Sequence, residues 1–506
     1  MHYPARSILT VTAAIVLTIT VLQFSNPSDK SGSAHAESVA LTHQTFLPLV
    51  FSPDSLVTPT AVSPTPVPSA TPSPTPNASQ TIRRVNAPNF KNGSIDYAST
   101  AIFWFGQVNL SDNYADVRVG YNNQKLFVSL NIIDRLLWYN PDPSTSPLTA
   151  WDSTTLYLNL EGNNGTTPGT NAYRFDGQLN WWEARSPYQA AYRGNGSGWS
   201  SSSATFTTTS SWRGNAPNDN TDDNGWQIAY EIPFTSLGLS GPPAQGTKWG
   251  LGVVLHDRDY IEYPASEEHW PETLAPNQPA TWGQLAFGLP QYSPPKTSSQ
   301  STVTVRQGLN SAVVPDAAVG GTMDNLCGSA QGTWQDWGNT AFPNAPRFNI
   351  QNQSDIADWM CFSKYYVTFP LNTIPSGKVV ISATLTLHEF GNSGQPDLAI
   401  PSLIQVMTVD KDWSPPLTWN NAPLARENVS RAWVDPITTF PGWPGVPWQW
   451  DVSRAVADAY ASGKPLRLVL YEADSAYHSG KYFTGSHEPD WNSAARPTLT
   501  VIWGNP

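Results

Sequence analysis

The feature that most constrains the fold is a strict alternation of apolar and polar residues in many short runs. In "KLFVSLNI", residues 125–132, leucine, valine and isoleucine alternate with lysine, serine and asparagine. The runs "ADVRVGY", residues 115–121, and "TLYLNLEG", residues 155–162, have the same period of two. Successive side chains of a strand point to opposite faces, so this pattern predicts half-buried antiparallel strands. Glycine, asparagine and aspartate between the runs supply turns, which favours a β-sandwich.

The last two hundred residues repeat this pattern with one exception. Strands are expected in four runs: residues 378–390, 403–413, 466–473 and 497–503. The segment "WDVSRAVADAYASGK" instead predicts a helix, with Asp451 as N-cap and Gly463 as its stop. Val452, Val456 and Tyr460 would then share one face. The fold class predicted for the chain is therefore all-β, with two jelly-roll-like β-sandwich domains, the second carrying one helical insertion.

The order of these blocks predicts five parts. They are a signal peptide or N-terminal anchor (1–36), a Pro/Thr/Ser-rich linker (37–80), a β-sandwich (81–289), a short linker (290–302) and a second β-sandwich (303–506). Segments such as "SPTPVPSATPSPTP" have too little apolar area to form a core and predict an extended spacer.

The N-terminus has the features of an export signal. Arg6 precedes an apolar run over residues 8–24, and Ala34-His35-Ala36 offers a cleavage site. Cleavage and retention as a membrane tether both stay open, although the run is shorter than a comfortable membrane span. In either case the remaining chain is expected outside the cytoplasm or on the cell surface, as a monomer.

The composition excludes one class of partner. The formal net charge is −12 and only 13% of residues are charged, whereas 12% are aromatic and 22 are tryptophan. A nucleic-acid partner would require a basic face, so none is expected. Many aromatic, amide and hydroxyl groups suit a neutral, polyhydroxylated ligand. The two cysteines, Cys327 and Cys361, predict a disulfide in an exported protein, with two buried thiols as the alternative.

The first block resembles the family 9 carbohydrate-binding modules. The matching pieces, in order, are "SID", "ADVRVGYNNQKLFVSLNIID", "WDSTTLYLNL", "GWQIAYEIPFTSLGLS", "KWGLGVVLHDRD" and "TWGQLAF". Tyr97 replaces the glycine of the family's opening Ile-Asp-Gly. The resemblance implies a sandwich that binds a sugar chain end between two aromatic rings, usually attached to a glycan-degrading enzyme.

The second block resembles the DNRLRE-type domain, which is related to carbohydrate-binding module family 96. Its pieces are "YYVTFPLNTIPSGKVVISATLTLHEF", "LTWNNAP", "WQWDVSRAV" and "FTGSHEPDWNSAARPTLTV". The start of the family pattern is altered in "GGTMDNLCGSAQGTW". The resemblance implies either binding of acidic polysaccharides or a purely structural role.

A predicted hairpin supplies the first candidate site. With Asp176-Gly177 as a two-residue turn, one face of the hairpin carries rings and amides. The candidate carbohydrate-binding residues on that face are Tyr173, Gln178, Asn180 and Trp182. The alternative is that these rings form core and bind nothing.

Loop-like stretches supply further candidates. Trp138, Trp270 and Glu268 lie in such stretches, where binding residues concentrate. In the second block, "FPGWPGVPWQW" places Trp443 and Trp448 among prolines, where a ring packed over the end of the sandwich is the favoured interpretation.

No cofactor is expected, apart from a structural Ca²⁺ as an alternative. Residues 220–231 nearly match the EF-hand spacing, but a strand follows and no helix precedes, which favours a chance match. A loop Ca²⁺ held by Asp219, Asp222 and Asp223 stays open.

The sequence carries no recognised catalytic constellation. Acids are plentiful, yet no pair is set apart by spacing as glycoside hydrolysis would require. The favoured function is a secreted or cell-surface, non-catalytic protein that binds extracellular polysaccharide. The alternatives are a structural or adhesive surface protein, and an ancillary part of a glycan-degrading system.

Overall fold

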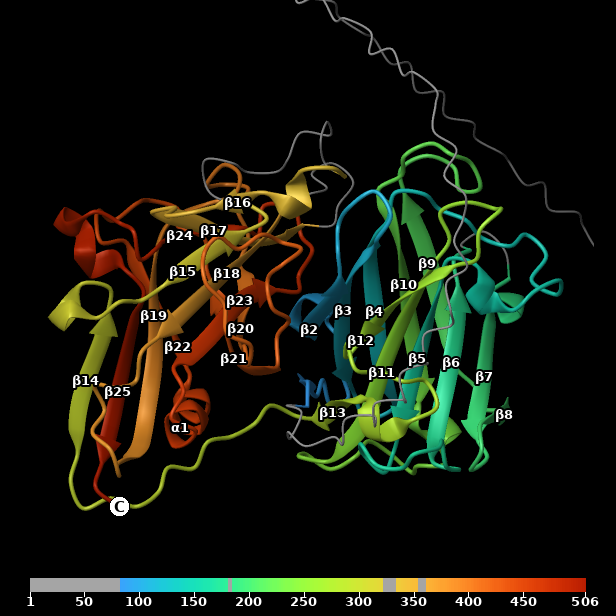
Figure 1. Cartoon of the computed structure of the whole chain (residues 1–506), viewed down its shortest axis with the longest axis horizontal. Coiled ribbons are helices and arrows are strands. Elements are labelled where there is room, and N and C mark those ends of the chain that lie inside the picture. The colour runs from blue at the N-terminus through green and yellow to red at the C-terminus, as the bar shows by residue number, and fades with distance from the viewer. Residues whose placement is uncertain (1–81, 181–183, 322–333, 354–360) are drawn as a thin grey trace, which may run out of the picture. The chain divides into compact units, whose positions relative to one another are not determined.

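The computed structural model describes residues 82–180, 184–321, 334–353 and 361–506, all within one compact unit. It contains two β-sandwiches, coloured blue to green and yellow to red in Figure 1. The prediction of an all-β, two-sandwich fold is confirmed. Residues 289–300, between the sandwiches in the chain, form neither helix nor strand.

The first sandwich consists of two sheets. One sheet has the order β2 (Ala101–Gly106), β3 (Tyr114–Tyr121), β4 (Lys125–Ile133), β10 (Gly225–Pro233) and β9 (Thr207–Arg213). The other has the order β1 (Arg84–Ala87), β13 (Gly283–Phe287), β11 (Lys248–Asp257), β5 (Ser153–Asn159), β6 (Ala172–Gln178), β7 (Gln189–Gly194) and β8 (Trp199–Ser201), with β12 (Ser266–Trp270) also paired to β11. Neighbours are antiparallel except β1 and β13, which are parallel.

The second sandwich also has two sheets. The outer one joins β14 (Ser301–Arg306), β25 (Thr498–Gly504), β19 (Val379–Asn392), β22 (Val446–Asp451), β24 (Lys481–Thr484) and β17 (Arg347–Gln353). The inner one joins β16 (Ala341–Phe342), β15 (Asp316–Val319), β18 (Cys361–Phe369), β23 (Leu466–Glu472), β20 (Ser402–Thr408) and β21 (Glu427–Val434).

The predicted helix is present as α1 (Ser453–Ala461). Its N-cap residue is Val452 and not the predicted Asp451, which instead accepts a hydrogen bond from the Ser453 backbone N at 2.9 Å. Gly463 follows the helix with a φ of +64°. Val456 is fully buried in the second core. Within the described residues, no helix is long and apolar enough to cross a membrane.

Strand β2 shows how the two sandwiches are joined. Phe103 and Phe105 point into the core of the first sandwich, whereas Ile102 and Trp104 belong to a separate buried cluster. That cluster also contains side chains of the second sandwich, among them Tyr366 of β18. Both faces of the "AIFWF" strand are therefore buried, which explains its continuous apolar run.

The predicted hairpin is wrong. Asp176 and Gly177 lie inside β6, where they pair with Thr155 and Thr154 of β5 and with β7 on the other side. A Cβ on Gly177 would lie 2.6 Å from the Ile228 Cδ1 atom of the facing sheet. The glycine therefore serves close packing between sheets and not a turn.

Candidate functional site

The residues predicted from the hairpin are mostly buried. Tyr173 is 4% exposed and Gln178 is 0% exposed. The Gln178 side chain accepts a hydrogen bond from the Asn140 backbone N and donates one to the Leu148 carbonyl, each at 3.0 Å. Asn180 is also buried, and Arg185 donates to its carbonyl. Trp182 lies outside the described residues.

The other predicted residues of the first sandwich lie apart from one another. Trp270 is buried, with its ring stacked on Phe103 at 4.0 Å between centroids. Trp138 is half-buried, and its backbone N donates to the Asp152 carboxylate at 2.6 Å. Glu268 alone among the predicted residues lines a pocket described for this structure.

This pocket has a volume of about 560 Å³ and lies between the two sandwiches. That volume falls within the usual range for small-ligand sites. The first sandwich contributes Trp104, Gly106, Gln107, Tyr114, Glu268 and Glu272, and the second contributes residues 411–414, 416, 417 and 419–424. We call it the inter-sandwich pocket.

Two indole groups of the pocket lack partners. The Nε1 atoms of Trp413 and Trp419 are buried without a hydrogen-bond partner among the described residues. The loop that carries them is fixed by Asn420, whose side chain accepts from the Val108 backbone N at 2.9 Å and donates to the Val108 carbonyl at 3.0 Å. Aromatic rings therefore line the pocket, with two unsatisfied donors buried beside it.

Three carboxylates line the pocket, and Asp412 among them pairs with Arg467 at 2.5 Å, whereas Glu272 and Glu268 have different environments. Glu272 receives both Arg83 nitrogens at 2.5 Å and Lys411 at 3.1 Å. Burial opposes ionisation of Glu272, yet these cations lower its pKa to about 2. Burial, with Asp112 nearby, raises the pKa of Glu268. Because Arg83 holds both Glu272 oxygens, that carboxylate is poorly placed to act as the second acid of a hydrolytic pair.

An aromatic cage lies behind the pocket. The Lys364 Nζ atom of β18 lies 4.0 Å from the Trp104 ring centroid and 3.6 Å from that of Trp419. It donates to the Tyr114 hydroxyl at 2.7 Å, and that hydroxyl donates to Asp116 at 2.5 Å. Burial holds the pKa of Lys364 well below its usual value. The cage connects the two sandwiches through the hydrogen bonds from Lys364 to Tyr114 and from Tyr114 to Asp116.

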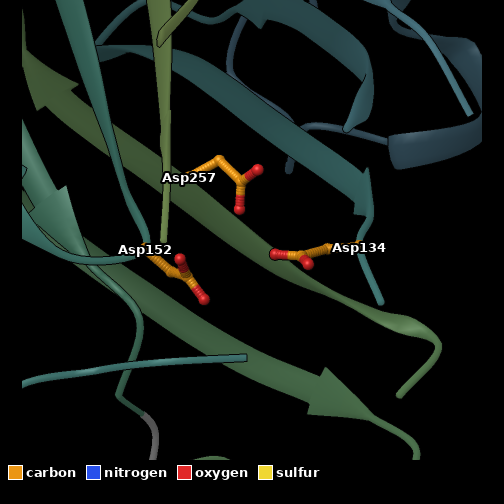
Figure 2. Close-up of side chains that lie close together, drawn as sticks. All are labelled: Asp134, Asp152 and Asp257. Carbon is orange, nitrogen blue, oxygen red and sulfur yellow. The ribbon is translucent and has the colours of Figure 1, made fainter. Parts of the chain in front are cut away.

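A second cluster lies at one edge of the first sandwich. Asp134 follows β4, Asp152 precedes β5 and Asp257 ends β11. Figure 2 shows the three side chains converging from these separate segments. One oxygen of each lies within 4.8 Å of one oxygen of the others, and all three residues are buried. We call this cluster the aspartate triad.

The triad has an uncompensated charge. Among the described residues, no lysine, arginine or histidine forms an ion pair with any of the three carboxylates. Asp134 Oδ2 and Asp257 Oδ1 have no hydrogen-bond partner there. Burial and mutual repulsion raise the pKa of Asp152 and Asp257, and burial with repulsion from Asp259 raises that of Asp134. Oxygens that lie within 4.8 Å of one another can share one Ca²⁺ ion, whose ligands lie at roughly 2.4 Å.

The three loop aspartates considered as Ca²⁺ ligands have environments that differ from those of the triad. Asp219 accepts hydrogen bonds from Thr221, and Asp222 pairs with Arg135 at 2.9 Å. Asp223 is buried, and burial raises its pKa to about 7. Within the described residues these three carboxylates do not form one group, whereas the triad does.

The triad carried a signal that could have been recognised in the sequence. Each aspartate stands next to a strand, and strands β5 and β11 are antiparallel, with Ser153 opposite His256. The start of one and the end of the other must therefore meet at the same edge. The pocket has no such signal, because its residues come from both sandwiches.

No family model and no curated protein matches this chain. Two solved structures with a similar arrangement are a family 9 carbohydrate-binding module from Caldicellulosiruptor kristjanssonii in complex with cellotriose and one in complex with glucose. They are 13% and 14% identical, with TM-scores of 0.30 and 0.29. The matches cover 41% and 42% of this chain and 94% and 100% of those chains. Similarity at this level does not identify a function, which must come from the residues themselves.

Proposed function

We propose that the protein binds a neutral glycan in the inter-sandwich pocket without cleaving it. The observation that carries this proposal is the pair of buried indole N–H groups, on Trp413 and Trp419, that have no partner among the described residues and lie beside the pocket. A buried donor without a partner costs free energy, and a sugar hydroxyl is an acceptor of suitable size.

The remaining groups of the pocket fit the same ligand. The half-buried Trp413 ring can pack against the C–H face of a sugar, and Glu268 and Asn421 can bind hydroxyl groups. Glu272 has its oxygens engaged by cations and serves to shape the pocket. The other two carboxylates that line the pocket, Glu272 and Asp412, are paired with Arg83 and Arg467, so binding is favoured over hydrolysis.

A glycan array with the purified chain, followed by calorimetry on the best oligosaccharide, tests this function. We expect Kd values in the micromolar to millimolar range, as is usual after ordering costs. Trp413→Ala should weaken binding about tenfold or more, because burial of one ring contributes about 1.5–3 kcal/mol. A second variant, Glu268→Gln, removes the charge of a carboxylate that lines the pocket. Its matched control is Glu262→Gln, which changes an exposed residue outside the pocket. Release of reducing sugar would overturn the non-catalytic part of the proposal.

We also propose that the aspartate triad holds a structural Ca²⁺ ion. Three buried carboxylates without a cation from the chain supply the hard oxygen ligands that Ca²⁺ prefers. A bound ion would satisfy the free oxygens of Asp134 and Asp257 and fix the loops that follow β4 and β11.

We further propose an extracellular location for this activity. The N-terminal run with Arg6 and Ala34-His35-Ala36 supports export, and the proline-rich segment supports a spacer. Pulse-labelling with an N-terminal sequence of the mature protein would distinguish a cleaved signal from a retained anchor. The predicted disulfide includes Cys327, which lies outside the described residues, and it stays a prediction.

A further inference from the structure

The second sandwich exposes a cluster of rings that the inter-sandwich pocket does not use. Phe440 is 42% exposed, Trp443 is 38% exposed and Trp491 is 65% exposed. Their ring centroids lie 5.2 Å apart for Phe440 and Trp443, and 5.7 Å apart for Trp443 and Trp491. We call these three residues the aromatic corner. Contiguous exposed rings of this kind usually mark an interaction site.

The structure holds the aromatic corner in place. Trp443 lies in the loop between β21 and β22, and this loop is tied to β19 by two hydrogen bonds between Asn392 and Ile437, at 2.8 and 3.0 Å. Trp491 lies on the 3₁₀ segment η9 (Asp490–Ala495), where Asn492 donates to Glu488 at 2.8 Å. Rings on such braced loops lose little conformational entropy when they bind a ligand.

The ring angles limit the shape of the ligand. The planes of Trp443 and Trp491 meet at 87°, and those of Phe440 and Trp443 at 73°. These rings cannot all lie flat on one planar surface, which excludes simultaneous stacking on the face of a crystalline polysaccharide. A single chain can instead place the C–H face of one sugar on one ring and the edge of that sugar against the next.

The charges beside the rings indicate a neutral ligand. The Arg347 guanidinium lies 5.1 Å from the Trp443 ring centroid, and its Nε lies 3.7 Å from Glu488. Glu488 is fully buried, so one cation faces one carboxylate and the local charge balances. Arg347 is 32% exposed, which leaves part of its guanidinium able to donate to hydroxyl groups.

We propose that the aromatic corner is a second saccharide-binding site, which takes a single neutral polysaccharide chain. The proposal rests on the proposed function for its class of ligand, but it uses none of the residues of the inter-sandwich pocket. Two sites on one chain would raise the apparent affinity for a long polysaccharide above that for a short oligosaccharide.

Affinity electrophoresis of the full chain tests the proposal. Native gels contain barley β-glucan or galactomannan as neutral probes, or polygalacturonate as an anionic one. Trp491→Ala and Trp443→Ala should each weaken retardation in a neutral gel about tenfold. Trp433→Ala, which removes a 46% exposed ring on β21, should leave retardation unchanged. Thermal unfolding of each variant verifies folding, and the 65% exposed Trp491 can be replaced with little effect on the core.

The variants separate failure of this proposal from failure of the proposed function. If Trp413→Ala loses binding while both corner variants bind like the parent chain, the aromatic corner is not a site and the pocket stands. If only the corner variants lose binding, the pocket assignment fails and this proposal stands. Retardation by polygalacturonate alone would overturn the neutral ligand. A change of sedimentation coefficient in corner variants, without a change in any gel, would make the corner an interface between copies and overturn the proposal.

Discussion

The Asp116 cluster and the aspartate triad are both buried, yet they solve the problem of buried charge in opposite ways. Asp116 accepts hydrogen bonds from Tyr114, Tyr471 and Asn352, and Arg118 lies 3.9 Å away. The triad places three carboxylates together without any ion-pair partner among the described residues. Asp116 itself is engaged by donors of the chain, although Arg118 Nη1 and Asn352 Oδ1 beside it lack partners among the described residues, whereas the triad carboxylates have no cation and two of their oxygens have no donor there.

This difference distinguishes buried groups that stabilise the fold from buried groups that bind a ligand. A buried charge that the chain partners completely adds to cohesion, in this case between the two sandwiches. A buried polar group without a partner costs free energy unless something from solution satisfies it. The indole N–H groups of Trp413 and Trp419 belong with the triad in this respect. The indole groups of Trp138, Trp226, Trp270 and Trp337 also lack partners among the described residues, so it is the pocket beside Trp413 and Trp419 that favours a hydroxylated ligand there.

The largest effect is expected from Asp116→Ala. It leaves Arg118, itself 0% exposed, without its carboxylate, and three donors without an acceptor. Loss of one partner from such a buried network costs about 3–5 kcal/mol. Urea unfolding measures this, with Asp397→Ala at an exposed position as control. A decrease of less than about 1 kcal/mol in the free energy of unfolding would show that the cluster does not stabilise the contact between the sandwiches.

Calcium should act on the triad and not on the Asp116 cluster. A ligand present at about 100 times its Kd stabilises the folded state by about 2.7 kcal/mol. Addition of Ca²⁺ to the EDTA-treated chain should therefore raise the melting temperature of the parent and of Asp116→Asn alike. No shift with Ca²⁺ in either protein would contradict a cation at the triad.

The pH dependence of this effect follows from the raised pKa values of the triad. In EDTA, each aspartate has a higher pKa in the folded state than in the unfolded state. The protonated forms are favoured by folding, so their contribution is complete below about pH 4 and is lost as the pH rises through the folded-state values. Stability in EDTA should fall over this window, and Ca²⁺ should stabilise more at pH 7 than at pH 5. Calorimetric melts at both pH values measure the difference.

A smaller effect of opposite sign is expected from Asp134→Asn. In EDTA at pH 7 it removes one of three repelling charges and should stabilise the fold by about 1 kcal/mol. It should also reduce the response to Ca²⁺, because a ligand with charge is lost. Asp116→Asn should destabilise under the same conditions. If both substitutions changed the unfolding free energy in the same direction, the contrast between the two clusters would be lost.

Much of the fold could be predicted from the sequence, because period-two alternation and helix stops are local signals. The helix α1 is an example, although it begins one residue later than predicted, with Val452 as its N-cap. The hairpin at Asp176-Gly177 was mispredicted because a glycine can serve a turn or close sheet packing, and only the facing Ile228 decides between them. Trp270 looked like a loop residue, yet it packs on Phe103 from a distant strand.

The sites depend on contacts between residues far apart in the chain, which could not be predicted from the sequence. Glu268 was a predicted binding residue, but the rings beside it, Trp413 and Trp419, belong to the other sandwich. Nothing in the order of the residues indicates that these two blocks bury a common surface. The triad could be predicted in part, because Asp134, Asp152 and Asp257 each lie at or next to the end of a strand. Whether these strand ends meet at one edge depends on the order of the strands in the sheet.

The central claim is that a glycan hydroxyl satisfies the buried indole group of Trp413. The direct measurement is the ¹⁵N-indole NMR signal of Trp413, assigned with Trp413→Phe, during titration with the best neutral oligosaccharide from the array. We expect a saturable downfield shift of this N–H signal, and loss of most affinity in Trp413→Phe. Saturable binding of the oligosaccharide with an unmoved Trp413 signal and an unchanged Kd in Trp413→Phe would contradict it.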